Sequence, residues 1–193
     1  MLTPSSQLAL LDGNGRRKYL AANELPRFLQ AAAKANVSTS LFCRLLAFTG
    51  CRVSEALSVT PMHLDHETGR VIFRTLKRRA VVFRVVPIPP DLMLALQHHC
   101  RGIPVEHKVW PWSRQTAWRR VKAVMAAARI SGPHAMPKGL RHGFGVANAE
   151  ENVPMATTQK WLGHAKLETT AIYQQAVGRE EHAFAQRIWD RWQ

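Results

Sequence analysis

The most informative stretch of this sequence is residues 49–57, TGCRVSEAL, where an arginine follows closely after a glycine break. Thr49-Gly50 interrupts an apolar helical pattern, and a new helix is expected to begin near Arg52. The first turn of a helix exposes free N–H groups and a positive dipole end, so an arginine there suits phosphate binding. The plainer alternative is an ion pair between Arg52 and Glu55, three residues later, without any ligand.

The segments on either side of this stretch predict a mainly α-helical domain with a small antiparallel β-sheet, an α+β fold. Apolar spacing predicts helices over about 22–35 and from Ser38 or Ser40 to Phe48, with one of these serines as the cap. Residues 70–74 and 80–86 are rich in β-branched and aromatic residues, which predicts a β-hairpin closed by prolines. Further helices are expected over about 91–99, 113–130 (capped by Ser113), 138–150, 154–162, 166–176 and 180–192, with a short extended piece at 109–110.

The chain is strongly basic, with 27 Lys and Arg against 13 Asp and Glu and a net charge of +14. Such an excess indicates a polyanionic partner, most commonly nucleic acid, although a basic surface can also serve solubility alone. Two acid-free segments, between Glu106 and Glu150 and between Glu67 and Asp91, indicate faces that follow a phosphate backbone. Their candidate DNA-contacting residues are Arg74, Arg78, Arg79, Arg114, Arg119, Arg120 and Lys122, and Arg84 lies in the second segment.

Length and cysteine content predict a single intracellular domain. At 193 residues with 46% hydrophobic side chains, the chain can bury one core, preceded by a flexible arm over residues 1–18. Three cysteines form no disulfide framework, as expected in a reducing cytosol. We find no signal peptide and no apolar run long enough to span a bilayer. His98-His99-Cys100 with His107 resembles a zinc site only in composition, because paired ligand spacing is missing, so no metal site is predicted.

Five further residues at four sites are of types that suit phosphate chemistry. Lys77 stands at the turn of the predicted hairpin, and Arg141 follows Lys138 near the start of a predicted helix. His164 comes directly after a glycine expected to end a helix, and Tyr173 lies nine residues further on. Each has an ordinary explanation when taken singly: solvated charge, helix-surface charge, a loop residue after a C-cap, and a packed tyrosine.

Taken together and in this order, the motifs resemble the tyrosine recombinase (phage integrase) family over residues 19–193, and the short layout is similar to the fimbrial phase-variation recombinases. The resemblance implies that family's catalytic-domain fold. It also implies an enzyme that cuts and rejoins DNA through a 3′-phosphotyrosyl intermediate, without metal, ATP or another cofactor. The implied partner is double-stranded DNA, bound by a homo-oligomer: a dimer at each site and a tetramer in the synapse. The implied location is the bacterial cytoplasm, associated with the nucleoid.

The resemblance also assigns chemical roles. Tyr173 is the nucleophile, and Lys77 is the general acid that protonates the departing 5′-oxygen. Two arginines donate paired N–H bonds to the non-bridging phosphate oxygens, a histidine hydrogen-bonds the same phosphate, and a carboxylate holds the arginines in place. The two arginines are Arg52 and Arg141, the histidine is His164 and the carboxylate is Glu55.

Lys138 departs from the family pattern, which usually has a histidine three residues before the second arginine. A lysine is charged at neutral pH and accepts no proton without a large fall in its pKa, so we expect Lys138 to contact the phosphate as a cation. The group that accepts the proton of Tyr173 therefore stays open, with His134 and His142 near in sequence.

The last predicted helix, 180–192, is amphipathic, because Phe184, Ile188 and Trp192 share one side, with Trp189 beside them. The resemblance implies that this helix docks into a neighbouring protomer, and packing on its own domain is the alternative. For the whole chain, two other functions remain open. One is a DNA-binding module without catalysis, and the other is a type IB topoisomerase, which uses similar chemistry without choice of site.

Overall fold

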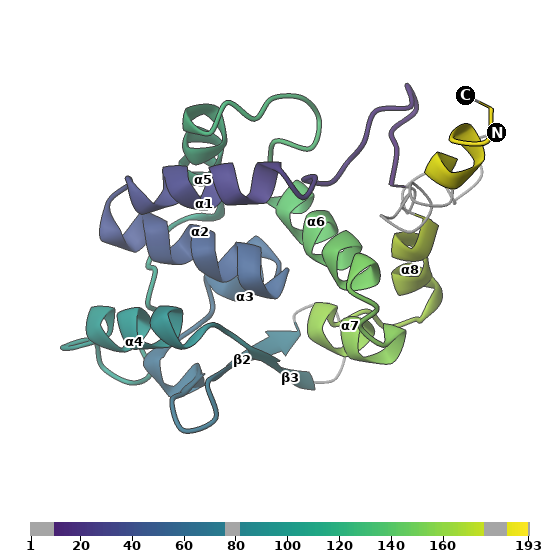
Figure 1. Ribbon diagram of the computed structural model, residues 1–193. Coiled ribbons are helices and arrows are strands. Elements are labelled where there is room, and N and C mark those ends of the chain that lie inside the picture. Colours follow the sequence, from purple (N-terminus) through teal and green to yellow (C-terminus); the bar gives the residue numbers. More distant parts are fainter. Residues whose placement is uncertain (1–9, 76–81, 176–184, 193) are drawn as a thin grey trace.

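A computed structural model describes residues 10–75, 82–175 and 185–192, and Figure 1 shows their arrangement. The fold is mainly helical with one three-stranded antiparallel sheet in the order β1-β2-β3, which confirms the predicted fold class. The elements are α1 (Glu24–Ala33), α2 (Val37–Thr49), α3 (Val53–Ala56), the 3-10 helix η2 (Pro61–His63), β1 (Leu64–Asp65), β2 (Arg70–Thr75), β3 (Val82–Pro87), α4 (Pro90–His99), α5 (Arg114–Ala127), α6 (Pro137–Glu150), α7 (Met155–Leu162), α8 (Glu168–Ala171) and the 3-10 helix η3 (Ile172–Gln175).

The ends of the helices follow local capping chemistry. The cap of α2 is Asn36, whose side chain accepts a hydrogen bond from the backbone N–H of Thr39 at 3.0 Å, so the predicted serine cap is wrong. For α5 the predicted cap is confirmed, because the Ser113 hydroxyl accepts from the N–H of Thr116 at 3.0 Å. At the C-termini of α2 and α7, Gly50 (φ 59°) and Gly163 (φ 66°) adopt the left-handed conformation that stops a helix.

The predicted hairpin is present as β2 and β3, with Phe73 opposite Arg84 and Val71 opposite Val86. Its inward face buries all four of these side chains, as the period of two requires. The third strand, β1, was not predicted, since two residues are too few to show a period. The extended piece expected at 109–110 is no strand: the N–H of Val109 donates to the carbonyl of Val59, and Trp110 is buried.

Two hydrophobic clusters hold the domain together. The larger one lies among α1, α2, α4, α5 and the sheet, around side chains such as Phe42, Leu46 and Trp110. The smaller one contains Leu10 and Tyr173, together with apolar residues of α6 and α7. In Figure 1 the helices α6, α7 and α8 lie on one side of the molecule, beyond the end of the hairpin.

The structure describes only part of the expected arm and part of the expected last helix. Of the expected arm, residues 1–9 lie outside the described residues, whereas 10–18 reverse direction in a turn where Leu11 pairs with Arg17 and Leu10 is buried. Of the expected last helix, 185–189 is helical, and Phe184 lies outside the described residues. Within the described ranges, no helix is both long and apolar enough to cross a membrane.

Candidate active site

A cleft of about 580 Å³ collects five of the six predicted catalytic residues. Side chains from four separate regions line it: the start of α3, the start of α5, the first turns of α6, and the segment from α7 to η3. The sixth residue, Lys77, lies outside the described residues, as do Arg78 and Arg79. The five residues in the cleft are Arg52, Lys138, Arg141, His164 and Tyr173.

Arg52 is the N-cap of α3 and is bound to Glu55 in two ways. Its Nη1 donates to Oε1 of Glu55 at 2.9 Å, and its backbone N–H donates to Oε2 at 2.8 Å. The ion pair considered from sequence is therefore present. This ion pair is compatible with ligand binding by Arg52, because Arg52 also lines the cleft and its side chain stays partly exposed.

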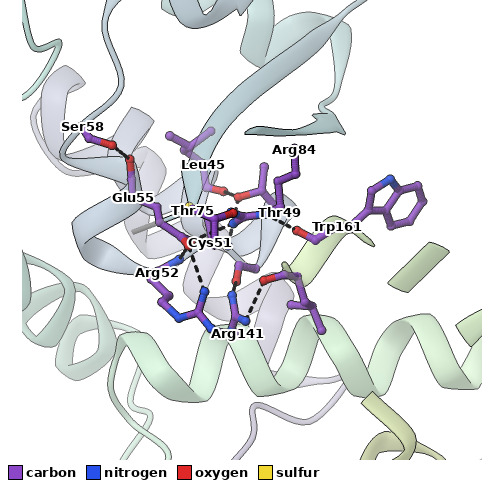
Figure 2. Close-up of polar contacts among 12 residues, drawn as sticks. Leu45, Thr49, Cys51, Arg52, Glu55, Ser58, Thr75, Arg84, Arg141 and Trp161 are labelled. Carbon is purple, nitrogen blue, oxygen red and sulfur yellow. Dashed lines mark hydrogen bonds and ion pairs between the residues drawn. The ribbon is translucent and has the colours of Figure 1, made fainter. Parts of the chain in front are cut away.

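Glu55 is fully buried and joins two arginines (Figure 2). Its Oε2 accepts from Nη2 of Arg84 at 2.7 Å, while Arg52 binds the other oxygen. Burial acts to raise the pKa of Glu55, but the hydrogen bond and charge of Arg84, followed by those of Arg52, bring it below the ordinary value. Glu55 is thus a carboxylate that holds a cleft arginine in a fixed orientation.

Arg84 is the main residue of this region that the sequence did not identify. The acid-free segment predicted a DNA-facing position, and this is wrong, because only 5% of Arg84 is exposed. Its Nε donates to the carbonyl of Trp161 at 2.8 Å, and its guanidinium lies over the Phe73 ring. The signal was available, since the alternation of β3 places Arg84 on the same face as the buried Val86.

Arg141 is buried and anchored on main-chain oxygens at two helix ends. Nη1 donates to the carbonyl of Gly50 and Nη2 to that of Leu162, both at 2.8 Å, at the C-termini of α2 and α7. Both oxygens belong to the negative ends of helix dipoles, which favour a cation. Burial first, then the nearby charge of Arg52, lowers the pKa of Arg141 to about 10, so it remains charged at pH 7. Two of five N–H donors are used, which leaves three for an anion.

Tyr173 lies in η3 and not in a regular α-helix, and only 2% of it is exposed. Its hydroxyl is 3.2 Å from Nδ1 of His142, on α6. Burial raises its pKa, against the opposing charges of Arg141 and Arg52. The ring packs against Gly145, where an added Cβ would lie 2.4 Å from two ring carbons. The glycine therefore provides the space for the tyrosine ring.

His164 follows the C-cap of α7, as the sequence predicted, and stacks on Tyr173 with ring centroids 6.2 Å apart and planes 18° apart. Its Nδ1 is hydrogen-bonded to the hydroxyl of Thr170 at 2.9 Å. Burial, followed by the charges of Arg141 and Arg52, lowers the pKa of His164 to about 3. The imidazole is therefore neutral at pH 7 and can donate a hydrogen bond from Nε2 once Nδ1 accepts from Thr170.

The remaining candidate residues differ in how available they are to DNA. Lys138 and Arg114 are exposed at the cleft, next to the exposed ring of Trp118. Arg74 and Arg119 are also exposed. By contrast, two others are half-buried and make contacts inside the domain: Arg120 donates to the Thr39 hydroxyl and lies over Trp112, and Lys122 donates to the carbonyl of Ala135.

The cleft combines a phenol with a set of fixed cations, which suits the binding of a phosphate diester next to a nucleophile. The two guanidiniums lie next to one another in Figure 2, and both influence the pKa of Tyr173. Cys51 also borders this space, but burial raises the pKa of its thiol to about 12, so it is no nucleophile at pH 7. Among the described residues, no three His, Cys, Asp or Glu side chains gather as metal ligands.

Solved structures of a site-specific recombinase and of a phage integrase share this fold. The XerH site-specific recombinase bound to palindromic difH substrate in a post-cleavage complex has a TM-score of 0.79 at 18% identity, covering 93% of this chain and 62% of that one. The catalytic domain of bacteriophage HP1 integrase has a TM-score of 0.66 at 20% identity, covering 88% and 93%, respectively. The fold is therefore that of a tyrosine recombinase catalytic domain.

The sequence comparisons agree with the fold. The model of the phage integrase family matches residues 18–179, so this chain belongs to the phage integrase family. It is 28% identical over 162 residues to the tyrosine recombinase XerA of Saccharolobus solfataricus, covering 84% of this chain and 54% of that protein. It is 31% identical over 180 residues to the tyrosine recombinase XerD of Bifidobacterium longum, covering 80% and 56%. The chain thus spans little more than half the length of these relatives.

Proposed function

We propose that residues 19–193 are a catalytic unit that cuts and rejoins duplex DNA at specific sites, through attack of the Tyr173 hydroxyl on a backbone phosphate. The observation that carries the proposal is that this phenol and the guanidiniums of Arg52 and Arg141 line the same cleft. Family membership supports it, as does the fold shared with XerH, which has been solved bound to its difH substrate.

In the proposed reaction, the Tyr173 oxygen bonds to phosphorus while the bond from phosphorus to the 5′-oxygen breaks. The products are a 3′-phosphotyrosyl link and a free 5′-hydroxyl, and attack by a 5′-hydroxyl of a partner strand reverses the step. The new ester conserves the energy of the old one, so no ATP is consumed. The negative charge of the transition state is met by Arg52 and Arg141, and losing such a fixed donor typically costs roughly 100- to 1,000-fold in rate.

Three further residues complete the proposed chemistry. His164 donates a hydrogen bond to a phosphate oxygen, and Lys138 contributes a positive charge at the edge of the cleft. Lys77 protonates the departing 5′-oxygen, since an ammonium with a pKa of about 10 is charged at pH 7 and suits an alkoxide leaving group. With this many fixed cations, the proposed reaction needs no metal ion.

The proposed partner is double-stranded DNA in the nucleoid, bound as a dimer at each site and a tetramer in the synapse. The C-terminal segment would connect the protomers: Ile188 is 48% exposed, Trp189 41% and Trp192 77%. Large apolar side chains at this exposure suit contact with another protein surface. Deleting residues 180–193 should then reduce strand exchange more than thermal stability, and a general loss of stability would indicate packing on the same domain.

The test is covalent capture of DNA. The probe is a duplex that carries the sequence selected by the purified protein from a random pool, with a nick next to the cleavage site. After cleavage, the short fragment that bears the 5′-hydroxyl diffuses away, so the strand cannot be rejoined and the adduct accumulates. We expect a protein–DNA adduct that Tyr173→Phe abolishes while DNA binding persists. Binding without an adduct would instead support a DNA-binding module. Relaxation of any supercoiled plasmid, without preferred sites, would support a type IB topoisomerase.

A further inference from the structure

The hydroxyl of Tyr173 has a side-chain partner that can take up a proton. Nδ1 of His142 lies 3.2 Å from this oxygen, and the two rings are 5.9 Å apart, inclined by 57°. His142 is one residue after Arg141 on α6, so the same helix that positions the arginine brings the imidazole to the nucleophile. The position where the family usually has a histidine holds Lys138, which is exposed.

The acceptor role of Nδ1 depends on which nitrogen of this imidazole bears the hydrogen. Nε2 of His142 is buried and has no hydrogen-bond partner among the described residues. A neutral imidazole carries one N–H and one lone pair, so the two nitrogens cannot serve as acceptors together. If Nε2 bears the hydrogen, the lone pair of Nδ1 points at the phenol, which is the arrangement of a base ready to accept.

Burial and the charges around His142 keep its imidazole neutral at pH 7. Lys138 and Arg141 face it from α6 and Lys18 from the N-terminal segment, and Tyr173 and His164 are the other titratable neighbours. Burial, followed by the charges of Lys138, Arg141 and Lys18, lowers the pKa of His142 to about 4. An entering phosphate brings negative charge to the cleft, which raises the basicity of the imidazole when it is needed.

The other histidines of this region are committed elsewhere. His164 stacks on the ring of Tyr173, and its Nδ1 is hydrogen-bonded to the hydroxyl of Thr170. His134 pairs with Glu24 through Nε2 at 3.2 Å. Of the described histidines, His142 is the one in hydrogen-bond contact with the phenolic oxygen.

We propose that His142 is the catalytic residue that accepts the proton of Tyr173 during strand cleavage and returns it during rejoining, an inference that rests on the proposed function. As the Tyr173 oxygen bonds to phosphorus, its O–H electron pair stays on oxygen and the proton moves to Nδ1 of His142. The P–O5′ bond breaks, and the leaving oxygen takes its proton from a separate cation. Rejoining runs the same transfers in reverse.

The first experiment separates proton acceptance from positioning. In His142→Asn the side-chain amide occupies the place of Nδ1 and can hold the phenol by a hydrogen bond, but it cannot take its proton. We expect adduct formation on the selected nicked duplex to slow by roughly 100- to 10,000-fold, the usual range for loss of a general base. His134→Asn is the matched control, because that histidine is equally buried and also has one unpartnered ring nitrogen. It should lower stability and leave the rate unchanged.

The second experiment changes the acidity of the nucleophile. The chain has two tyrosines, Tyr19 and Tyr173, so a Tyr19→Phe background allows fluorinated tyrosine to be placed at 173 alone. A more acidic phenol depends less on a base, so the loss caused by His142→Asn should shrink with fluorotyrosine. An equal loss with both phenols would show a structural role and overturn the proposal.

The third experiment needs no variant at 142. In ¹⁵N NMR of the full chain at pH 7, the Nδ1 signal of His142 should have the shift of an unprotonated ring nitrogen and Nε2 that of a protonated one. The opposite tautomer would make His142 a donor to the phenol and overturn the proposal, even if His142→Asn failed to fold. If wild type forms no adduct at all, the proposed function fails. If it forms one that needs Tyr173 but not His142, only this inference fails.

Discussion

Replacing Gly145 by alanine should disable the nucleophile without touching any polar group. The new Cβ would lie 2.4 Å from Cε2 and Cζ of Tyr173, whereas ordinary contact begins at 3.4 Å, so the ring must move by about 1 Å. A displacement of about 1 Å in a reacting group can cost roughly 100-fold in rate. In an interior helical position alanine otherwise stabilises by about 0.5–1 kcal/mol, so global unfolding is not the expected cause.

The assay is the single-turnover rate of adduct formation on the selected nicked duplex, with the thermal midpoint measured in parallel. Gly143→Ala is the matched control, since it makes the same change on the same helix, where the new Cβ meets Leu20 at 3.0–3.3 Å and not the tyrosine. We expect Gly145→Ala to cut about 100-fold more slowly than Gly143→Ala. Equal rates from two folded variants would refute the view that Gly145 sets the position of Tyr173.

Four further outcomes follow from the same contacts. Arg84→Met should reduce the free energy of unfolding by about 3–5 kcal/mol in urea titrations, because it leaves the buried Glu55 carboxylate without its main partner. The free energy of unfolding should also fall as the pH drops below 6.5, because burial lowers the pKa of His164 to about 3 and the unfolded chain takes up a proton that the folded chain does not. His164 contributes up to about 1.4 kcal/mol per pH unit to this slope, and His164→Gln should remove that part while the part from His142, whose pKa burial lowers to about 4, remains. Arg114→Ala should weaken DNA binding, measured by fluorescence anisotropy, and reduce the salt dependence of log K by about one. Lys138→His should keep cleavage activity and Lys138→Ala should lower it, and an inactive His variant beside a fully active Ala variant would remove Lys138 from the site.

Arg70, which is exposed, is the control for Arg84→Met, and Arg120, which makes contacts inside the domain, is the control for Arg114→Ala. Arg70→Met, at an exposed place on β2, should leave stability nearly unchanged, so a similar loss there would contradict the importance of the Arg84–Glu55 pair. Arg120→Ala should lower stability, because Arg120 contacts Thr39 inside the domain, and it should leave the salt dependence as in wild type. A lower salt dependence would instead place Arg120 on the DNA.

The sequence predicted those features that depend on neighbours along the chain. The bounds of α6, expected at 138–150, differ from the observed Pro137–Glu150 by one residue, because a proline and apolar spacing mark that helix locally. The hairpin was equally clear from its β-branched residues. The cap of α2 was missed because asparagine and two serines competed within five residues, and only the folded backbone selects Asn36.

Other features were missed because they depend on contacts between distant segments. Arg84 binds the carbonyl of Trp161, 77 residues away, and no local pattern reports such a partner. The 3-10 geometry around Tyr173 and the space above Gly145 arise from the packing of η3 on α6. Motif spacing could therefore name the residues of the cleft and Glu55, but not the other groups that hold them.

The carbonyls of Gly50 and Leu162 that hold Arg141 belong to the peptide backbone, which every amino acid supplies. Substitution at either position leaves the acceptor oxygen intact as long as both helices still terminate where they do. During divergence, this anchor is thus maintained by chain geometry alone, whereas Arg84 and Glu55 must change together or not at all. The anchor of Arg141 therefore constrains where two helices end, and Gly50 must stay a glycine there because an added Cβ would lie 2.7 Å from the ring of Phe144. The anchor of Arg84 constrains the side chain of Glu55 instead.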